Sequence, residues 1–519
     1  PPTLTTPGVF INEVNAFPNS VVPVATAIPA FVGYTARASY HGKSYTGIPV
    51  RIESFQEYIM YFAELDDLGA SLSEDQQYTP VYQPVPVKDR ATADFFIDDK
   101  PFRLEPDPST VFYLYNSIKL FYQNGGTTCF VVSVGDYGAP RGQIKAPADP
   151  LVNPNVEADK LTKGVDALER EDEPTMIVIP DATLLEAEDH AALCQHVLMQ
   201  CQALGSRVGI LDIVGGDDPD PLQWKNDITA FRTAVGQTGL NYGISYYPFL
   251  KTSVMQETDI NFKNLGGGKG LSATLPGASV EPLKTLLANA DKPPGPGVPS
   301  AQQTENALTT VSPVYKQLRK ALREKVNILP PSGAMAGAYT LIDNERGVWH
   351  APANISLASV VDTTVKINDS EQGGLNVDAT TGKSVNVIRL FLGRGVVVWG
   401  ARTLDGNSQD WRYLNVRRTM IMIEQSMKLA ANHYVFQPND ANTWSLVKSM
   451  LNKFLTSLWA EGALVGATPE AAFSVAVGIG TTMTGEDILN GIMNITVKVA
   501  VSHPAEFIVI TISQQMQTS

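Results

Sequence analysis

The run VGILDIV, from Val208 to Val214, is nearly continuous in apolar residues and lacks the polar alternation of a half-exposed strand. Three further runs share this character at wide spacing: Phe130 to Val134, Met176 to Ile179 and Tyr242 to Tyr247. Such runs are typical of strands that are buried on both faces of a parallel sheet. The sequence therefore predicts an α/β layer in the middle of the chain.

Helix-like segments separate the later runs, as crossover connections between parallel strands require. They span Glu186 to Leu204 and Gln223 to Val235, and earlier segments of the same kind span Ser54 to Leu68 and Ser109 to Gln123. Because 519 residues exceed the usual domain size of roughly 100 to 200, we expect two or three domains of mixed α/β and α+β class.

Two stretches interrupt the α/β pattern. The segment from Ser71 to Asp107 is acidic and rich in proline, and it has the composition of an insertion. The segment from Gln256 to Val326 is loop-like, with LGGGKG and KPPGPGVP ahead of a helical stretch from Val314 to Glu324. Glycine and proline in such numbers are typical of an exposed insertion or linker.

The two ends of the chain have a different character. Near the N-terminus, Pro7-Gly8 precedes a short strand-like run from Val9 to Val14, and the prolines that follow end regular pairing. The last part returns to order, with a strand-like RGVVVWGART at 394–403, a helix from Trp411 to Tyr434, and strands from Ile495 to Val501 and from Glu506 to Ser513.

A second C-terminal helix begins after the turn Gln437 to Asp440 and is amphipathic. Its apolar face carries Val447, Met450, Leu451, Phe454, Leu455 and Leu458. Its polar face carries Ser445, Lys448, Ser449, Asn452, Lys453 and Thr456, and is basic.

The formal net charge of −14 argues against nucleic acid as a partner, because a phosphate backbone would be repelled. The charge is unevenly distributed. Residues 388–519 carry ten Lys or Arg and nine Asp or Glu, a net +1, which leaves −15 for the preceding 387 residues. This contrast suggests that the two parts meet different surface requirements.

No apolar run reaches the 18 residues that a membrane span needs, and PPTLTTPGVF lacks the regions of a secretory signal. The chain has three cysteines, Cys129, Cys194 and Cys201. This number is small and odd, which argues against a disulfide framework. We therefore expect folding in a reducing cytosol.

Candidate catalytic and ligand-binding residues are few. PPSGAMAG around Ser332 has a small-residue surround like that of a serine nucleophile, with Asp343 and His350 nearby in sequence, but no G-x-S-x-G elbow occurs. A tight structural turn is the simpler interpretation. Asp181 and Asp212 follow predicted strands, where open α/β sheets bind ligands, yet capping of the following turn or helix is favoured.

Two further patterns have simple structural interpretations. LGGGKGLS, from Leu265 to Ser272, lacks the spacing of a phosphate loop and is expected to be a flexible loop. His190, Cys194 and Cys201 have helical spacing, and a buried helix face is favoured over a metal site. Nothing in the sequence requires a cofactor, a nucleotide or a metal ion.

Both terminal strands are suited to adding onto the sheet edge of another subunit, although pairing within their own chain is the simpler alternative on spacing alone.

Motifs along the whole chain resemble the contractile tail sheath family of phage tails, bacteriocins and related injection systems. Upstream they are TPGVFINEV, AIPAFVGYT, FYQNGGTTCFVVSVG and PPSGAMAGAYTLIDNERGVWHAPAN. At the C-terminal end they are RGVVVWGART, WRYLNVRR, VFQPND, TWSLVKSMLNKFLTSLWAEGAL and PAEFIVITISQ. The inserted regions match the family weakly.

The resemblance implies an inner sheath module formed by the N- and C-terminal segments, and a subtilisin-like α/β domain without catalytic chemistry that carries outer insertions. The expected divisions are 1–36 (arm and start of the core), 37–255 (α/β domain, insertion at about 71–107), 256–326 (outer insertion), 327–387 (return to the α/β domain) and 388–519 (inner sheath domain with a terminal arm strand).

The function that the resemblance implies is structural: a subunit that polymerises helically around an inner tube and contracts to drive the tube through a target envelope. The implied partners are further copies of the chain in stacked sixfold rings, the tube protein, and baseplate and terminal cap proteins. Assembly would take place in the cytoplasm of the producing bacterium. The alternatives are another virion or baseplate protein, or a degenerate subtilisin-like hydrolase.

The resemblance also assigns roles to particular residues. The arms that would link subunits are Val9, Phe10, Ile11, Asn12, Glu13 and Val14 at one end and Phe507, Ile508, Val509, Ile510, Thr511 and Ile512 at the other. The basic helix face with Lys448, Asn452 and Lys453 is expected to rest against an acidic tube surface.

Overall fold

The computed structural model describes residues 21–63, 78–292 and 297–509. Contacts within the chain divide it into two units. The larger unit is Ala25–Arg418, and the described part of the smaller unit is 21–24 together with 419–509.

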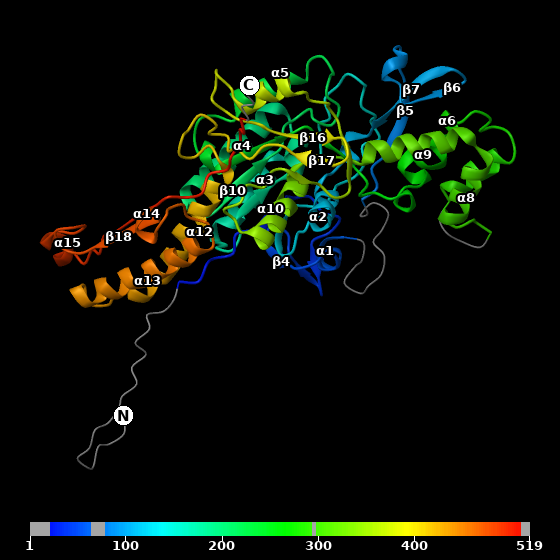
Figure 1. The fold of residues 1–519 in the computed structure, drawn as a ribbon. Coiled ribbons are helices and arrows are strands. Elements are labelled where there is room, and N and C mark those ends of the chain that lie inside the picture. The colour runs from blue at the N-terminus through cyan, green and yellow to red at the C-terminus, as the bar shows by residue number, and fades with distance from the viewer. Residues whose placement is uncertain (1–20, 64–77, 293–296, 510–519) are drawn as a thin grey trace, which may run out of the picture. The chain divides into compact units, whose positions relative to one another are not determined.

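A nine-stranded sheet forms the centre of the larger unit (Figure 1). Its strands, in spatial order, are β14 (Ile355–Ser356), β17 (Gly395–Val398), β16 (Asn386–Phe391), β11 (Gly243–Tyr247), β10 (Val208–Leu211), β9 (Met176–Val178), β1 (Pro29–Gly33), β8 (Cys129–Ser133) and β4 (Val50–Ile52).

The predicted parallel strands are confirmed. The four apolar runs form β8, β9, β10 and β11, and every residue of these strands is buried. The parallel pairs are β8 with β1, β1 with β9, β9 with β10, β10 with β11, and β11 with β16. Burial on both faces explains why these runs carry no polar alternation.

Sequence reasoning did not predict the strand β1, although it lies between β8 and β9 near the middle of the sheet. The strand begins with Pro29, which usually interrupts strand pairing, so the run was not recognised as a strand. Alternate side chains of β1 face opposite helical layers. Phe31 contacts Phe121 of α2, with ring centroids 5.4 Å apart, whereas Val32 faces Gly164 of α3, where a Cβ would lie only 2.5 Å from Val32 Cγ1.

Helices therefore cover both faces of the sheet, as the crossover connections predict. One layer contains α2 (Leu114–Gln123) packed on α10 (Ser332–Arg346), and the other contains α3 (Ala158–Asp166) packed on α4 (Ala187–Leu204). The predicted helix from Gln223 to Val235 is α5 (Trp224–Ala234), and α1 (Phe55–Phe62) lies within the predicted segment from Ser54, whose last residues are outside the described part.

Smaller elements complete the larger unit. They are the hairpin β2 (Ser39–Tyr40) and β3 (Lys43–Ser44), the sheet β13 (Ile328–Leu329), β12 (Leu250–Thr252) and β15 (Val360–Thr363), and the helix α11 (Asp369–Asn376).

The expected boundary at residue 388 differs from the division in the structure. RGVVVWGART does contain a strand, β17, but this strand pairs with β16 in the main sheet, with Ile388 opposite Val398. Main-chain pairing therefore holds this region in the larger unit, and the division falls at Arg418/Thr419 inside α12 (Leu414–Ala431). A strand run read from sequence does not reveal which sheet it joins.

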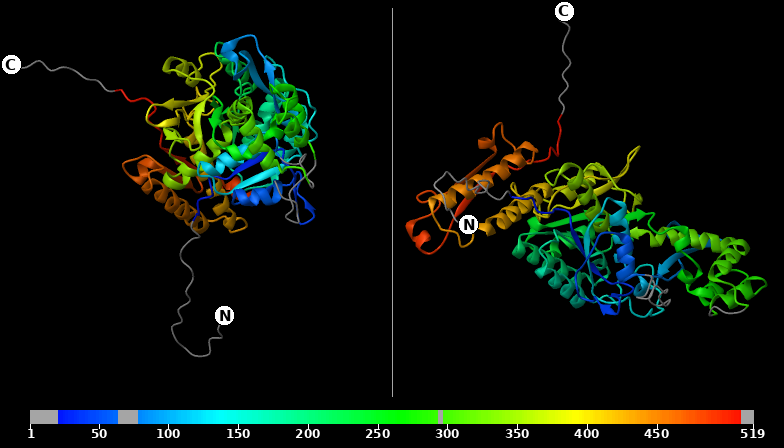
Figure 2. Two further views of the ribbon diagram at one scale, coloured as in Figure 1. Left: turned by 90° about the vertical axis from the view of Figure 1, so that its right-hand side faces the viewer. Right: turned by 90° about the horizontal axis from the view of Figure 1, so that it is seen from below.

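The two interruptions form a second lobe on one side of the larger unit (Figures 1 and 2). The described part of the first interruption is a small sheet of β5 (Tyr82–Pro86), β7 (Lys100–Pro106) and β6 (Phe95–Ile97). The second is helical: α6 (Gly267–Thr274), α7 (Leu283–Ala290), α8 (Ala301–Val311) and α9 (Pro313–Val326).

The loop-like character expected ahead of Val314 was therefore wrong, and so was the flexible loop at LGGGKGLS, which lies mostly within α6. The helical stretch expected from Val314 to Glu324 is confirmed as part of α9. Its glycines serve close packing: a Cβ on Gly268 would lie 2.1 Å from the Leu287 carbonyl oxygen on α7. Glycine lets the two helices approach at this point. Composition alone does not distinguish that use of glycine from flexibility.

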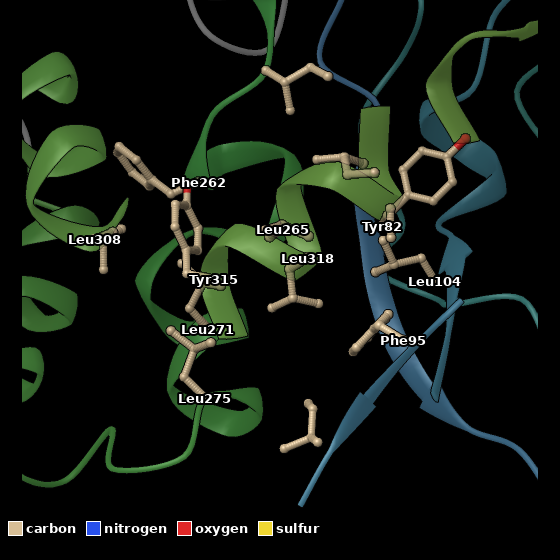
Figure 3. Packing of buried hydrophobic residues seen from close by; sticks show 14 of the residues in the cluster. Tyr82, Phe95, Leu104, Phe262, Leu265, Leu271, Leu275, Leu308, Tyr315 and Leu318 are labelled. Carbon is tan, nitrogen blue, oxygen red and sulfur yellow. The ribbon is translucent and has the colours of Figure 1, made fainter. Parts of the chain in front are cut away.

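The second lobe has a hydrophobic core of its own (Figure 3). Tyr82, Phe95 and Leu104 of the small sheet share one buried cluster with Phe262, Leu265, Leu271, Leu275, Leu308, Tyr315 and Leu318 of the helical segment. The two insertions, far apart in sequence, thus bury their apolar surfaces against one another.

The smaller unit is built from the end of α12 and from α13 (Ala441–Ala460), α14 (Pro469–Ala472), β18 (Phe473–Val477), α15 (Gly485–Leu489) and β19 (Ile495–Val499). The predicted helices over 411–434 and after Asp440 are confirmed as α12 and α13, and the strand predicted at 495–501 is confirmed as β19. The strand β18 was not predicted.

Candidate functional site

The candidate nucleophile Ser332 is a buried structural residue. It is the first residue of α10, and its backbone N–H donates to Asp212 Oδ1 at 3.0 Å. Its hydroxyl donates to Asp212 Oδ2. Asp212 therefore satisfies the start of a helix that lies 120 residues further along the chain.

Asp181, after the end of β9, likewise accepts hydrogen bonds from the start of a helix. Its carboxylate accepts the N–H groups of Tyr113 at 2.7 Å and Leu114 at 3.2 Å, at the start of α2, and that of Tyr34 at 2.9 Å. A Cβ on Gly33 would lie 2.6 Å from Asp181 Oδ2, so glycine makes room for this carboxylate. Capping was expected of both aspartates, but the capped elements come from distant sequence and not from the following segment.

Burial governs the protonation of both carboxyls. Desolvation raises the pKa of Asp181 to about 6 and that of Asp212 to about 7, although the donated hydrogen bonds act in the opposite direction. The two groups lie at the carboxyl ends of neighbouring parallel strands, where α/β folds often place ligands. Here their oxygens accept from backbone N–H groups and, at Asp212, also from the Ser332 hydroxyl.

The expected buried helix face is confirmed for His190, Cys194 and Cys201 on α4. His190 Nε2 lies 3.0 Å from the Asp212 carbonyl oxygen, and Cys194 Sγ lies 3.6 Å from the same nitrogen. Burial lowers the pKa of His190 to about 4 and raises the pKa of Cys194 and Cys201 to about 12. The imidazole and the thiols are therefore neutral near pH 7, which suits core packing.

Asp343 belongs to a separate buried ion pair. Arg418 donates to it through both terminal nitrogens, at 2.9 and 2.6 Å, and each side chain is only 3% exposed. His350 is exposed in the turn after α10. The three residues considered for a triad thus have different partners or surroundings.

The Arg418–Asp343 pair holds the start of the described chain within the larger unit. The Thr26 hydroxyl donates to Asp343 at 2.6 Å, and the Thr26 carbonyl accepts from Arg418 at 2.9 Å. Bidentate pairing and the two additional bonds compensate the desolvation of both charges. Sequence reasoning missed this cluster, although the resembling motifs WRYLNVRR and TLIDNERG contain its charged residues.

The amphipathic helix of the smaller unit is as predicted. Asp440 caps α13 by accepting from Thr443 N, and the six predicted apolar residues are all buried. Lys448 and Lys453 are exposed on the opposite face, and Asn452 is partly exposed. The position of these side chains agrees with a surface role, and the identity of what they contact stays a prediction.

The smaller unit contains a two-stranded sheet. β18 and β19 pair antiparallel from Phe473 opposite Val499 to Val477 opposite Ile495. No third strand joins either of them within the described residues. Isolated two-stranded sheets are marginally stable, and unpaired edges accept further strands.

Part of the predicted C-terminal arm lies in the described region. Phe507, Ile508 and Val509 are 72%, 80% and 87% exposed, and they belong to no strand of this single chain. Ile510, Thr511 and Ile512 lie outside the described residues, as does the whole N-terminal arm from Val9 to Val14. Subunit linkage by these segments stays a prediction.

Within the described residues, no helix combines the length and apolar character that a bilayer crossing requires.

Comparison with known proteins gives these features a context. Residues 407–515 match the family described as phage tail sheath C-terminal domain. The tail sheath protein of Vibrio phage KVP40 is 22% identical over 182 residues, and that of Burkholderia phage BcepMu is 25% identical over 191 residues. These matches cover 35% and 36% of this chain, but only 27% and 39% of the two relatives.

The likeness to solved structures extends over nearly the whole chain. The helical sheath of the anti-feeding prophage in its contracted state is 26% identical, with a TM-score of 0.59 and coverage of 99% of this chain and 100% of that chain. The contracted sheath complex of the PVC extracellular contractile injection system is 24% identical, with a TM-score of 0.58 and coverage of 99% and 98%. The chain therefore has a mixed α/β multidomain fold similar to that of contractile sheath structures.

Proposed function

We propose that this chain, whose C-terminal part carries the phage tail sheath domain and whose whole length has the fold of contractile sheaths, is a subunit of a contractile sheath. It polymerises helically around an inner tube and contracts to drive that tube through a target envelope. The subunit acts as a structural protein, and its work is done by assembly and change of packing.

The full-length likeness to a contracted helical sheath is the observation that carries this proposal. A match confined to one domain would leave the role of the rest open. Here the α/β unit, the lobe and the smaller unit all lie within the matched 99% of the chain.

Linkage between subunits is proposed to occur through the terminal arms. Among the described residues no third strand pairs with the outer edges of β18 and β19, and exposed residues such as Phe507 to Val509 lie in a segment with strand-like sequence. A strand donated by a neighbour forms main-chain hydrogen bonds without a separately folded interface. The arms from Val9 to Val14 and from Phe507 to Ile512 would join copies into a mesh.

The larger unit is proposed as the outer part of the sheath, with a subtilisin-like arrangement that no longer serves catalysis. Its buried Ser332 and Asp212 support this interpretation, because they bond to one another and cap a helix. The partners beyond the chain itself would be the tube, the baseplate and a terminal cap, with assembly in the cytoplasm of the producing bacterium. Contraction would release a metastable packing, with the arms as hinges.

Electron microscopy of the purified chain with its tube protein tests the function directly. Striated hollow cylinders are expected, which shorten and widen when contraction is triggered. Discrete particles of fixed subunit number, with no tendency to grow along an axis, would show that the chain is a different kind of particle component.

The basic face of α13 is proposed to contact an acidic tube surface. Replacement of Lys448 and Lys453 by glutamate should leave the fold unchanged, because both side chains are exposed. It should prevent assembly of extended particles around the tube, since several weak contacts of roughly 0 to 1 kcal/mol per subunit would become repulsive. The measurement is the yield of extended particles by microscopy.

The matched control is Lys88→Glu with Lys100→Glu, which changes the net charge equally at exposed sites of the larger unit. Normal extended particles from the α13 variant would contradict the assignment of this helix to the tube contact.

A further inference from the structure

The helical segment of the second lobe is basic within an acidic chain. Residues 256–326 carry nine Lys or Arg and six Asp or Glu, a net +3. The chain as a whole carries −14, so the remaining residues sum to −17. The helical segment and the rest of the chain therefore carry net charges of opposite sign.

The positive charge is concentrated on α9. Lys316, Lys320 and Arg323 are all exposed and recur at positions i, i+4 and i+7, so they follow one another along one face of the helix. We call these three residues the α9 stripe. They line a groove of about 430 Å³ together with Arg319, Ile260, Thr309 and two carboxylates, Glu257 and Glu324.

The cations beside the stripe are neutralised within the lobe. Arg319 lies 3.0 Å from Glu305 and 3.5 Å from Glu257, and Lys325 lies 3.3 Å from Asp94. The α9 stripe differs, because among the residues that the structure describes its three side chains form no ion pair.

The helix that carries the stripe is held firmly in place. Ser312 caps its start by accepting from Tyr315 N, and Leu318 and Leu322 are fully buried in the lobe core. Like charges at i, i+4 spacing destabilise a helix. The stripe is therefore a preformed row of positive charges. Carboxylates of a partner would reduce the repulsion between these charges.

We propose that the α9 stripe docks onto the acidic α/β body of a second copy of this chain. This inference rests on the proposed function, in that it takes the chain to be a repeating unit of a polymer. In a polymer each lobe meets the same neighbouring surface, so a weak complementary contact is multiplied along the assembly. The groove beside the stripe is lined by four cationic side chains and two carboxylates, and this net positive charge attracts a neighbour's acidic side chains.

A second copy is favoured as the occupant by its charge. The part of each copy outside the helical segment carries −17, and some of its carboxylates are exposed. Glu186, Glu188 and Asp189 at the start of α4 are exposed and form no ion pair with other described residues, whereas Asp159 on α3 is paired with Lys163 at 2.6 Å. Carboxylates of this kind are available to cations from outside the chain.

The test compares two charge-reversal variants of the full chain. Lys316→Glu, Lys320→Glu and Arg323→Glu reverse the stripe. Lys269→Glu, Lys284→Glu and Lys292→Glu reverse three exposed lysines of the same helical segment that lie off the stripe, with the same change in net charge. Circular dichroism and thermal unfolding of both variants confirm that each is folded.

The concentration at which polymer first forms is then measured by light scattering and microscopy. At about 0.1 M salt the stripe variant should need at least about tenfold more protein than wild type, whereas the control should stay within about threefold. At about 1 M salt the difference should disappear, because the screening length falls to about 3 Å. Equal thresholds for wild type and the stripe variant at low salt would overturn the proposal.

A photo-crosslinking residue at the exposed position Gln317, beside the stripe, identifies the occupant independently. Crosslinked peptides from the α/β body of a second copy support the proposal. Crosslinks to the tube protein, to another component, or to none overturn it. If wild type itself forms no cylinders under any condition, the proposed function fails, whereas normal cylinders without a stripe effect reject only this inference.

Discussion

At the scale of single residues, burial changes the protonation of Asp212 and therefore its contribution to stability. Its carboxylate faces Ser332 at the start of α10, and desolvation raises its pKa to about 7. The ordinary value near 3.8 applies to the unfolded chain. The stability contributed by this group is thus complete below about pH 4 and is lost as the pH rises through about 7.

Asp212→Asn should remove that pH dependence. The amide oxygen still accepts from Ser332 N, and the Ser332 hydroxyl can turn to accept from the amide N–H₂. Relative to wild type, the variant should gain roughly 2 to 4 kcal/mol in free energy of unfolding at pH 8, and little at pH 4. Urea unfolding at both pH values measures the difference. A constant difference between pH 4 and pH 8 would show that ionisation of Asp212 costs the fold nothing.

Phe436 is a second residue of interest, because its backbone lies in the left-handed region. It has a φ of +67° and its side chain is fully exposed, although a bulky residue in this region is strained. Phe436→Asn should be more stable than Phe436→Ala by about 1 kcal/mol, because asparagine tolerates left-handed backbone and alanine does not. Thermal unfolding of the two variants provides the comparison, and equal stability would show that the backbone relaxes when the ring is removed.

At the scale of elements, the hydrophobic core of the lobe packs the two insertions against one another. Leu318 of α9 is fully buried among residues from both insertions. Such a core excludes water from elements that have little stability when isolated.

Leu318→Ala should therefore destabilise the lobe by about 2 to 5 kcal/mol, through lost burial and a residual cavity. Limited proteolysis should cut first within residues 256–326. The control is Val311→Ala on α8, where the side chain is 38% exposed and the cost should stay within about 0.5 kcal/mol. If cleavage of the Leu318 variant were no faster than that of the control, the lobe would not depend on this core.

At the scale of the whole molecule, the two units differ in how their strands are protected. The central strands β9 and β10 have neighbours on both sides and every residue buried, whereas β18 and β19 have only one another within the described residues. Local opening should therefore need less free energy in the smaller unit.

Hydrogen exchange of the unassembled chain should be at least about tenfold faster for amides of β18 and β19 than for those of β9 and β10. In the polymer the amides of β18 and β19 should become protected, since donated arms would pair with their free edges. Protection that is already complete in the unassembled chain would argue that these edges are not used for assembly.

The sequence by itself determined the elements with strong local patterns. Strands buried on both faces appear as uninterrupted apolar runs, so β8 to β11 were predictable, and the 3.6-residue period revealed the two faces of α13. Weak patterns failed: β1 begins with proline, and α6 is rich in glycine. In the candidate site, the exposure of Lys448 and Lys453 was likewise predictable from helical spacing.

Only the tertiary structure decided which distant segments meet. Asp212 caps α10, although 120 residues separate Asp212 from Ser332 in the sequence. Arg418 binds Asp343 and Thr26. The two insertions share a core, although strands of the main sheet lie between them in the sequence. The same holds for β17. Its sequence predicted a strand, but only the structure shows that this strand pairs with β16 in the main sheet. The physical reason is that local patterns record whether a residue is buried, whereas its partner is selected by packing and hydrogen bonds between segments that sequence spacing does not relate.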